Sequence, residues 1–139
     1  MDDSILFIEK QGCSGRIHRL NKEVEFLDTS PMKYLNRLCL EKITTLEGRI
    51  QAIKQTCNIV KNVPIYIDDN LILFSINSFK SVDNIFINSV YIKYIEKQGI
   101  KTKIVFYDNE CIVIKKPSHL MKSKYEKCMK IKKQINQYC

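Results

Sequence analysis

The second half of the sequence alternates between apolar and polar residues, and short polar turns interrupt this alternation. Residues 63–67 and 71–76 flank Asp68-Asp69-Asn70, and residues 100–107 and 110–115 flank Asp108-Asn109. Short alternating segments around turns rich in Asp and Asn are typical of β-hairpins. Because the strands of a hairpin run antiparallel, this pattern predicts a mostly antiparallel sheet.

Further strands are predicted on either side of these hairpins. Residues 85–95 alternate as one strand, with Phe86, Asn88, Val90, Ile92 and Tyr94 on one side. Near the N-terminus, residues 4–9 are predicted as a strand, and residues 16–20 and 23–27 as a hairpin around Asn21-Lys22.

Two helices are predicted within residues 30–58. Ser30 followed by Pro31 suits an N-cap and a first helical residue. The run Thr44-Thr45-Leu46-Glu47 fits a capping box, in which a threonine hydroxyl and the glutamate satisfy exposed backbone donors. Gly48 follows in the first turn, where glycine is costly, so we expect close packing or a backbone contact there.

A basic amphipathic helix is predicted at residues 118–137, after Pro117 ends the sheet region. Its apolar stripe steps by three or four residues through Met121, Tyr125, Cys128, Ile131, Ile135 and Tyr138. An isolated helix of this length is marginal in water, so the stripe needs a surface to cover. Either the stripe packs on the chain's own sheet, or it pairs with the same stripe of a second copy. In both arrangements the lysines of the helix are expected to face outward as a row.

Strands, two helices, hairpins and a final helix in this order favour an α+β fold. A length of 139 residues suits a single domain, 1–139. Within it we expect N-terminal strands in 1–29, two helices in 30–58, antiparallel hairpins in 63–115 and the basic terminal helix in 118–137.

No pattern in the sequence indicates catalysis, a cofactor or a metal site. The two histidines, His18 and His119, lie in no recognisable motif, and four glycines are too few and too scattered for a phosphate-binding loop. Six cysteines lack the Cys-x-x-Cys spacing of a metal site, so we expect buried thiols that act as small apolar residues. We therefore predict that the protein is not an enzyme.

The sequence also shows no export signal or membrane span. The first residues are acidic where an export signal is basic, and no apolar stretch approaches the ~20 residues of a membrane span. We expect a cytoplasmic protein whose cysteines are reduced.

Positive charge is concentrated at the C-terminal end. Residues 115–139 hold eight lysines and one acid, Glu126, and so carry +7 of the net charge of +8. This asymmetry favours contact with a polyanion, although a solvated charged tail has the same composition. The candidate DNA-binding residues are Arg49, Lys54, Lys61, Lys122, Lys124, Lys127, Lys130, Lys132 and Lys133. For Arg49 two roles stay open, a contact with DNA or an internal salt bridge.

Five ordered segments give the chain a resemblance to the ComK family of competence transcription factors. They are Y-L-x-x-x-C-L at 34–40, T-L-E-G-R at 45–49, K-x-V-P-I at 61–65, L-F-S-I-x-S at 73–78, and F-I-N at 86–88 with Ile92. Each segment alone is unspecific, so the resemblance depends on their order and spacing. Two positions depart from the family pattern: Phe86 stands where tryptophan is frequent, and Ser75 where proline is frequent.

The resemblance implies a transcription regulator that activates DNA-uptake genes. It implies a homo-oligomer that binds paired A·T-rich boxes of double-stranded DNA, largely through the minor groove, and that is controlled by a proteolytic adaptor. Narrow A·T-rich minor grooves attract Lys and Arg, in agreement with a basic chain that lacks a recognition-helix motif. Because paired boxes need two copies, the resemblance favours the dimer among the two arrangements of the terminal helix.

Other functions stay open at this point. The chain is shorter at its C-terminal end than the best-known type in the family, so it is either an activator or a truncated modulator without activation. A different class of function is a protein-interaction module whose basic helix docks on a partner or an anionic surface. RNA is the other polyanion that such a chain would bind.

Overall fold

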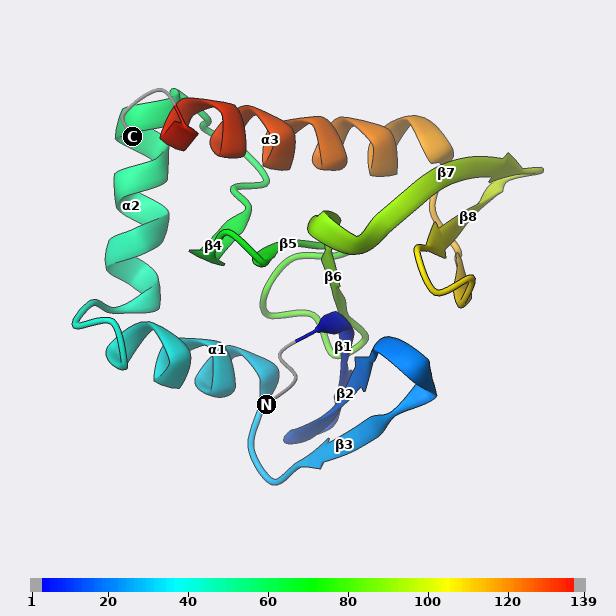
Figure 1. Cartoon of the computed structure of the whole chain (residues 1–139), viewed down its shortest axis with the longest axis horizontal. Coiled ribbons are helices and arrows are strands. Elements are labelled where there is room, and N and C mark those ends of the chain that lie inside the picture. The colour runs from blue at the N-terminus through cyan, green and yellow to red at the C-terminus, as the bar shows by residue number, and fades with distance from the viewer. Residues whose placement is uncertain (1–3, 137–139) are drawn as a thin grey trace.

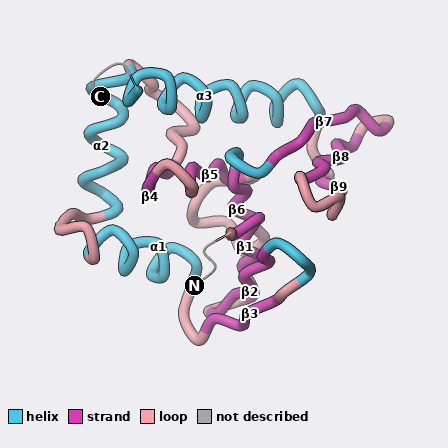
Figure 2. The backbone as a smooth tube through the Cα atoms, viewed as in Figure 1, coloured by secondary structure: helices cyan, strands magenta, loops and turns pink. Residues whose placement is uncertain are grey.

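A computed structural model that describes residues 4–136 contains nine strands in two antiparallel sheets (Figure 1, Figure 2). The first sheet has the order β3-β2-β1-β6-β5-β4, and the second has the order β7-β8-β9. The strands are β1 (Ile5–Gln11), β2 (Ser14–Arg19), β3 (Val24–Leu27), β4 (Ile65–Asp68), β5 (Leu71–Ser75), β6 (Ile85–Asn88), β7 (Ile92–Gln98), β8 (Lys101–Phe106) and β9 (Cys111–Ile114). The helices are α1 (Pro31–Leu40), α2 (Leu46–Cys57) and α3 (Ser118–Asn136), with short 3₁₀ turns η1 (Leu20–Lys22) and η2 (Ser89–Tyr91). The predicted α+β class is confirmed.

The predicted hairpins form β2–β3, β4–β5 and β8–β9. Turn chemistry explains two of them, since the Asp68 carboxylate accepts from the backbone N–H of Asn70 and the Asp108 carboxylate accepts from that of Glu110. These local bonds need no distant partner, which is why the sequence reveals these turns.

The six-stranded sheet is covered on both of its faces. In β5, Leu71 and Leu73 pack into the core that includes α1 and α2. Ile72 and Phe74, which point the opposite way, pack into a second core with β7, β8, β9 and α3. The sheet is therefore the middle layer, and α3 with the second sheet forms one outer layer (Figure 1).

The stripe of α3 is buried on the chain's own elements. Met121 and Cys128 belong to the second core, and Ile131 packs against Ile53 and Cys57 of α2. Met121, Cys128 and Ile131 are each 0% exposed, so the expectation that this stripe pairs with a second copy is wrong. The alternative, packing on the chain's own fold, is the one observed. Tyr138 and the expected helix end at Gln137 lie outside the described residues.

The caps of α1 and α2 differ in how well the sequence predicts them. The Ser30 hydroxyl accepts from the backbone N–H of Lys33 at 3.3 Å, as expected. The cap of α2 is Thr45, whose hydroxyl accepts from the backbone N–H of Gly48 at 2.9 Å, so the predicted reciprocal box with Glu47 is wrong. A Cβ atom at Gly48 would lie 3.0 Å from that hydroxyl oxygen. The close approach expected at Gly48 is thus to its own cap.

The predicted single strand at residues 85–95 is two strands in different sheets. β6 ends at Asn88, whose side chain is fully buried and makes four hydrogen bonds. Its amide nitrogen donates to the carbonyls of Ile5 and Asn70, both at 2.8 Å, and its oxygen accepts from the N–H groups of Ile72 (3.1 Å) and Val90 (3.2 Å). The bond to Val90 caps η2, so the chain leaves the first sheet before β7 begins.

The expectation of buried thiols holds for part of the chain. Cys39, Cys57 and Cys128 are buried, and burial raises the pKa of the Cys128 thiol to about 12. Cys13 and Cys111 are exposed, so the expectation is wrong for these two. Cys139 lies outside the described residues.

Replacing Asn88 is expected to destabilise the fold strongly. Asn88→Ala leaves the buried backbone groups of Ile5 and Ile72 without their partner, at a cost of about 1–3 kcal/mol for each group, and also removes the partly buried bond to Asn70. We expect the free energy of unfolding, measured by urea titration, to fall by at least about 2 kcal/mol. The exposed Asn136, changed in the same way, serves as the control and should shift it by less than about 0.5 kcal/mol. An Asn88→Ala protein as stable as the control would contradict this role.

Candidate nucleic-acid interface

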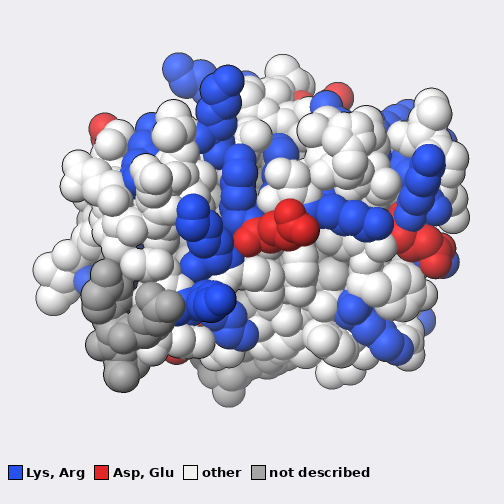
Figure 3. Space-filling model, turned by 90° about the horizontal axis from the view of Figure 1, so that it is seen from above, with Lys and Arg blue, Asp and Glu red and all other residues white. Residues whose placement is uncertain are grey.

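The side of α3 opposite its buried stripe carries exposed lysines. Lys122, Lys130 and Lys133 are exposed, and their spacing places them on one side of the helix together with Glu126. Figure 3 looks onto the α3 side of the molecule and shows Lys and Arg side chains spread across it, with acidic side chains among them. This face is basic without being uniformly so.

Two of the predicted α3 lysines turn toward the protein. Lys124 donates from Nζ to the carbonyl of Ser75 at 2.6 Å, and Lys127 donates to the carbonyl of Lys61 at 2.8 Å. Burial, reinforced by the neighbouring charges of Lys116 and Lys127, lowers the pKa of Lys124. The expectation that all six lysines face outward as a row is wrong for Lys124 and Lys127, and Lys132 is half-buried.

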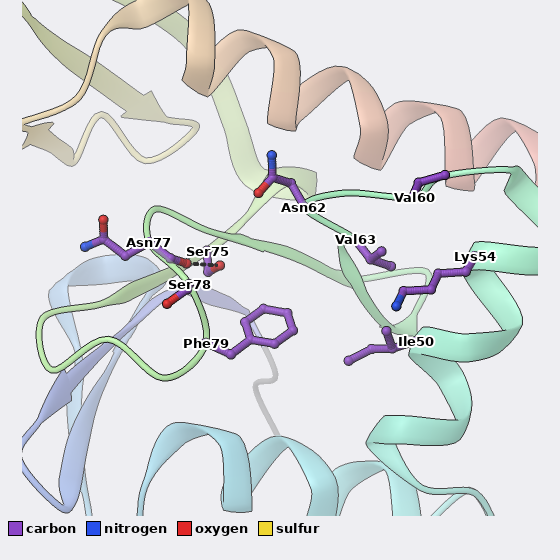
Figure 4. A pocket seen from close by; sticks show the side chains of 9 residues that line it. All are labelled: Ile50, Lys54, Val60, Asn62, Val63, Ser75, Asn77, Ser78 and Phe79. Atoms are coloured by element: carbon purple, nitrogen blue, oxygen red, sulfur yellow. Dashed lines mark hydrogen bonds between the residues drawn. The ribbon is translucent and has the colours of Figure 1, made fainter.

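Of the predicted residues outside α3, Lys54 and Lys61 are exposed, and Lys54 lines a pocket. Lys61 is exposed and adjoins α3 through its carbonyl. Lys54 is exposed on α2 and lines the pocket, whose other side includes Ser75 and Phe79 (Figure 4). Lys54 is the charged member of this lining, which includes neither a carboxylate nor a histidine. The pocket therefore offers no pair of groups for acid–base chemistry.

A groove joins the outer side of α3 to the second sheet. Its lining includes Lys93 and Tyr94 from β7, and Lys122, Tyr125 and Glu126 from α3. Tyr94 is 46% exposed, so its ring is available to a ligand. Lysines beside exposed aromatic rings suit a nucleic acid, because the amines neutralise phosphates and the rings offer stacking surfaces.

The β7–β8 hairpin adds lysines that lie outside the predicted set. Lys97 and Lys101 are exposed and Lys103 is half-exposed, while Glu96 is the acid in this hairpin. The sequence of this hairpin has an excess of positive charge. The first 114 residues together hold nearly equal numbers of basic and acidic residues, so the total charge of that segment does not reveal this local excess. Counting charge along each predicted hairpin would have identified these residues.

Comparison with known proteins assigns the family. The family model described as ComK protein matches residues 5–139, which is almost the whole chain. The chain belongs to the ComK family. The predicted resemblance is confirmed, and the family consists of competence transcription factors rather than enzymes. Neither the curated proteins nor the solved structures include a match to the chain.

Two further findings concern the described part of this ComK-family chain. Between residues 4 and 136, no group of three or more His, Cys, Asp or Glu side chains is placed to hold a metal ion. None of the helices in that range has the length and hydropathy needed to cross a membrane.

Arg49 is placed apart from the lysine face, against β4. Its Nη1 donates to the carbonyls of Tyr66 (3.0 Å) and Ile67 (2.8 Å), and its guanidinium carbon lies 5.8 Å from the centre of the Tyr66 ring. Burial and a hydrogen bond to Asp69 raise the pKa of Tyr66 to about 12. These contacts link α2 to the sheet through carbonyl oxygens instead of the salt bridge considered from the sequence.

We expect Arg49→Ala to lower stability and to leave DNA binding unchanged once the protein is folded. The substitution removes two charge-assisted hydrogen bonds, each worth about 1.5–3 kcal/mol. Lys54→Ala, on the exposed side of the same helix, is the matched control and should change the free energy of unfolding by less than about 0.5 kcal/mol. Urea unfolding and a DNA titration well below the melting temperature separate the two roles. Normal stability with weakened binding would place Arg49 in the interface.

Proposed function

We propose that this ComK-family chain binds double-stranded DNA and regulates competence genes by reading A·T-rich boxes, largely through the minor groove. The observation that carries the proposal is the set of exposed lysines that extends from the outer side of α3, through the groove with Tyr94 and Tyr125, to β7, with Glu126 as the acid among them. Lysines along an extended surface neutralise successive phosphates and release their counterions, which provides affinity for any duplex.

An A·T preference is the finer part of the proposal. A·T-rich minor grooves are narrow, and their enhanced negative potential attracts basic side chains. Lysines on the protein surface are attracted by that potential, so an A·T preference does not require a helix that reads base edges in the major groove. Family membership in the competence transcription factors supports DNA as the polyanion, ahead of RNA.

The structure weakens the competing proposal of a docking helix. A helix that inserts into lipid or into a partner's groove needs an exposed apolar face. In α3 that face holds Met121, Cys128 and Ile131, all of which are buried within the chain.

A cytoplasmic location accords with a role on DNA. Binding to paired boxes as a homo-oligomer requires a contact between copies other than this stripe, and control by a proteolytic adaptor stays an expectation from the family.

The direct test compares A·T-rich and G·C-rich duplexes of equal length in a binding titration at several salt concentrations. We expect tighter binding to the A·T-rich duplex and an affinity that falls steeply with salt, with a logarithmic slope of about 0.9 for each phosphate contact. Equal affinity for both duplexes at physiological salt would leave a nonspecific polycation. Absence of binding at low salt would refute the proposal as a whole.

Removing two outward lysines of α3 should weaken binding without changing sequence preference. For Lys130→Gln with Lys133→Gln, we expect the salt slope to fall by about 1.8, since each lost phosphate contact removes about 0.9. The control is Lys33→Gln with Lys42→Gln, two exposed lysines in and just after α1, which lies away from α3 (Figure 1). Equal losses in the two double variants would show that total charge, and not the α3 face, determines affinity.

A further inference from the structure

The β7–β8 hairpin ends in a two-residue turn that carries an exposed isoleucine. Gln98 pairs with Lys101, so the turn consists of Gly99 and Ile100. Gly99 has a φ of +64°, while Ile100 has no positive φ. This pattern fits a type II′ turn, which requires glycine at its first position and makes no demand for an aliphatic residue at its second. Ile100 is nevertheless 86% exposed.

Exposure alone does not distinguish Ile100, because Ile43 is 95% exposed and Val82 is 77% exposed in other loops. The difference lies in what surrounds each of them. Ile100 lies at the end of a hairpin that extends past α3 to the edge of the molecule (Figure 1). Lys101 adjoins it, and Lys97 and Lys103 follow along the two strands.

The hairpin presents lysines on both of its faces. Cross-strand partners share a face of a sheet, and Lys97 pairs with Thr102, whose side chain is buried. Lys97 therefore belongs to the inner face. Lys101 and Lys103 flank Thr102 along β8, and since successive side chains alternate, they belong to the outer face, where Glu96 is the cross-strand partner of Lys103 and leaves a net positive charge. A body with positive charge on both faces is complementary to a groove that has a phosphate backbone on each side.

We propose that the β7–β8 hairpin is the element that enters the minor groove, and that Ile100 inserts between neighbouring base pairs as a wedge. The inference rests on the proposed DNA-binding function and adds the residue that distinguishes sequences. Apolar side chains, isoleucine among them, unstack base steps in the minor groove and bend the duplex toward the major groove. Steps such as TA open most easily, so a wedge favours A·T-rich sites through their deformability.

The experiment measures DNA bending and sequence preference for Ile100→Ser. Serine keeps the turn, since the second position of a type II′ turn accepts polar residues. Bending is followed by energy transfer between dyes at the two ends of an A·T-rich duplex, and preference by titration against a G·C-rich duplex. We expect the wild type to shorten the end-to-end distance. For Ile100→Ser we expect the bend to be lost and the A·T preference to fall about tenfold, an effect comparable to one mismatched base pair. The salt slope should stay unchanged because every lysine remains.

Two controls make the outcome specific. Ile100→Leu retains an apolar tip and should still bend DNA. Val82→Ser removes, from another loop, an aliphatic side chain that is also largely exposed, and should have no effect. Binding and bending by Ile100→Ser at wild-type levels would overturn the wedge and leave the proposed function standing. Tight binding by the wild type without any bend would overturn it too. No DNA binding by the wild type would mean that the proposed function itself fails.

Discussion

The buried side chain of Asn88 determines where the second half of the fold lies. Its four hydrogen bonds join β1, the β4–β5 hairpin, β6 and η2, and they stop β6 at the point where the alternating pattern would continue it. Because the chain turns here, β7 starts a separate sheet above the first. That sheet, with the adjoining face of the first, provides the surface that buries Met121 and Cys128. The outer layer that carries the lysines thus begins at this amide, and the neighbouring Ser89 hydroxyl, which donates to the Ile72 carbonyl, supports the same turn.

Burial of the α3 stripe decides which charges the helix can offer to a ligand. Residues at the border of the stripe, Lys124 and Lys127, satisfy carbonyl groups of neighbouring segments and become part of the fold. Lys130 and Lys133 lie on the far side of the helix and are exposed, so they can contact a ligand. The net charge of a helix therefore overstates its binding charge whenever some lysines lie beside the packing face.

Local signals explain what could be predicted from the sequence, and distant partners explain what could not. The hairpin turns, the Ser30 cap and the stripe of α3 as far as Ile135 depend on residues a few positions apart, and these predictions are confirmed. The capping box with Glu47 is a local prediction that is wrong, because the cap of α2 lies one residue later, at Thr45. The split at Asn88 depends on Ile5, 83 residues away, and the orientation of Lys124 depends on Ser75, 49 residues away. Arg49 belongs to the same group, since its carbonyl partners lie in β4. A single sequence contains no signal for such pairs, so the predicted site mixed structural cations with exposed ones.

We assign phosphate binding to α3 and sequence discrimination to the β7–β8 hairpin because the two elements differ in how they are packed. α3 is anchored along its length by buried residues, so its outer lysines form a fixed track, suited to phosphates whose spacing hardly varies with sequence. Pairing with β9 holds β8 as far as Thr102, which is itself buried, so the part of the β7–β8 hairpin that projects is its tip around Gly99 and Ile100. A projecting tip can follow a groove whose width and stiffness do vary with sequence. Affinity and discrimination then reside in different elements, and a sequence change in one would alter binding strength while a change in the other would alter the choice of site.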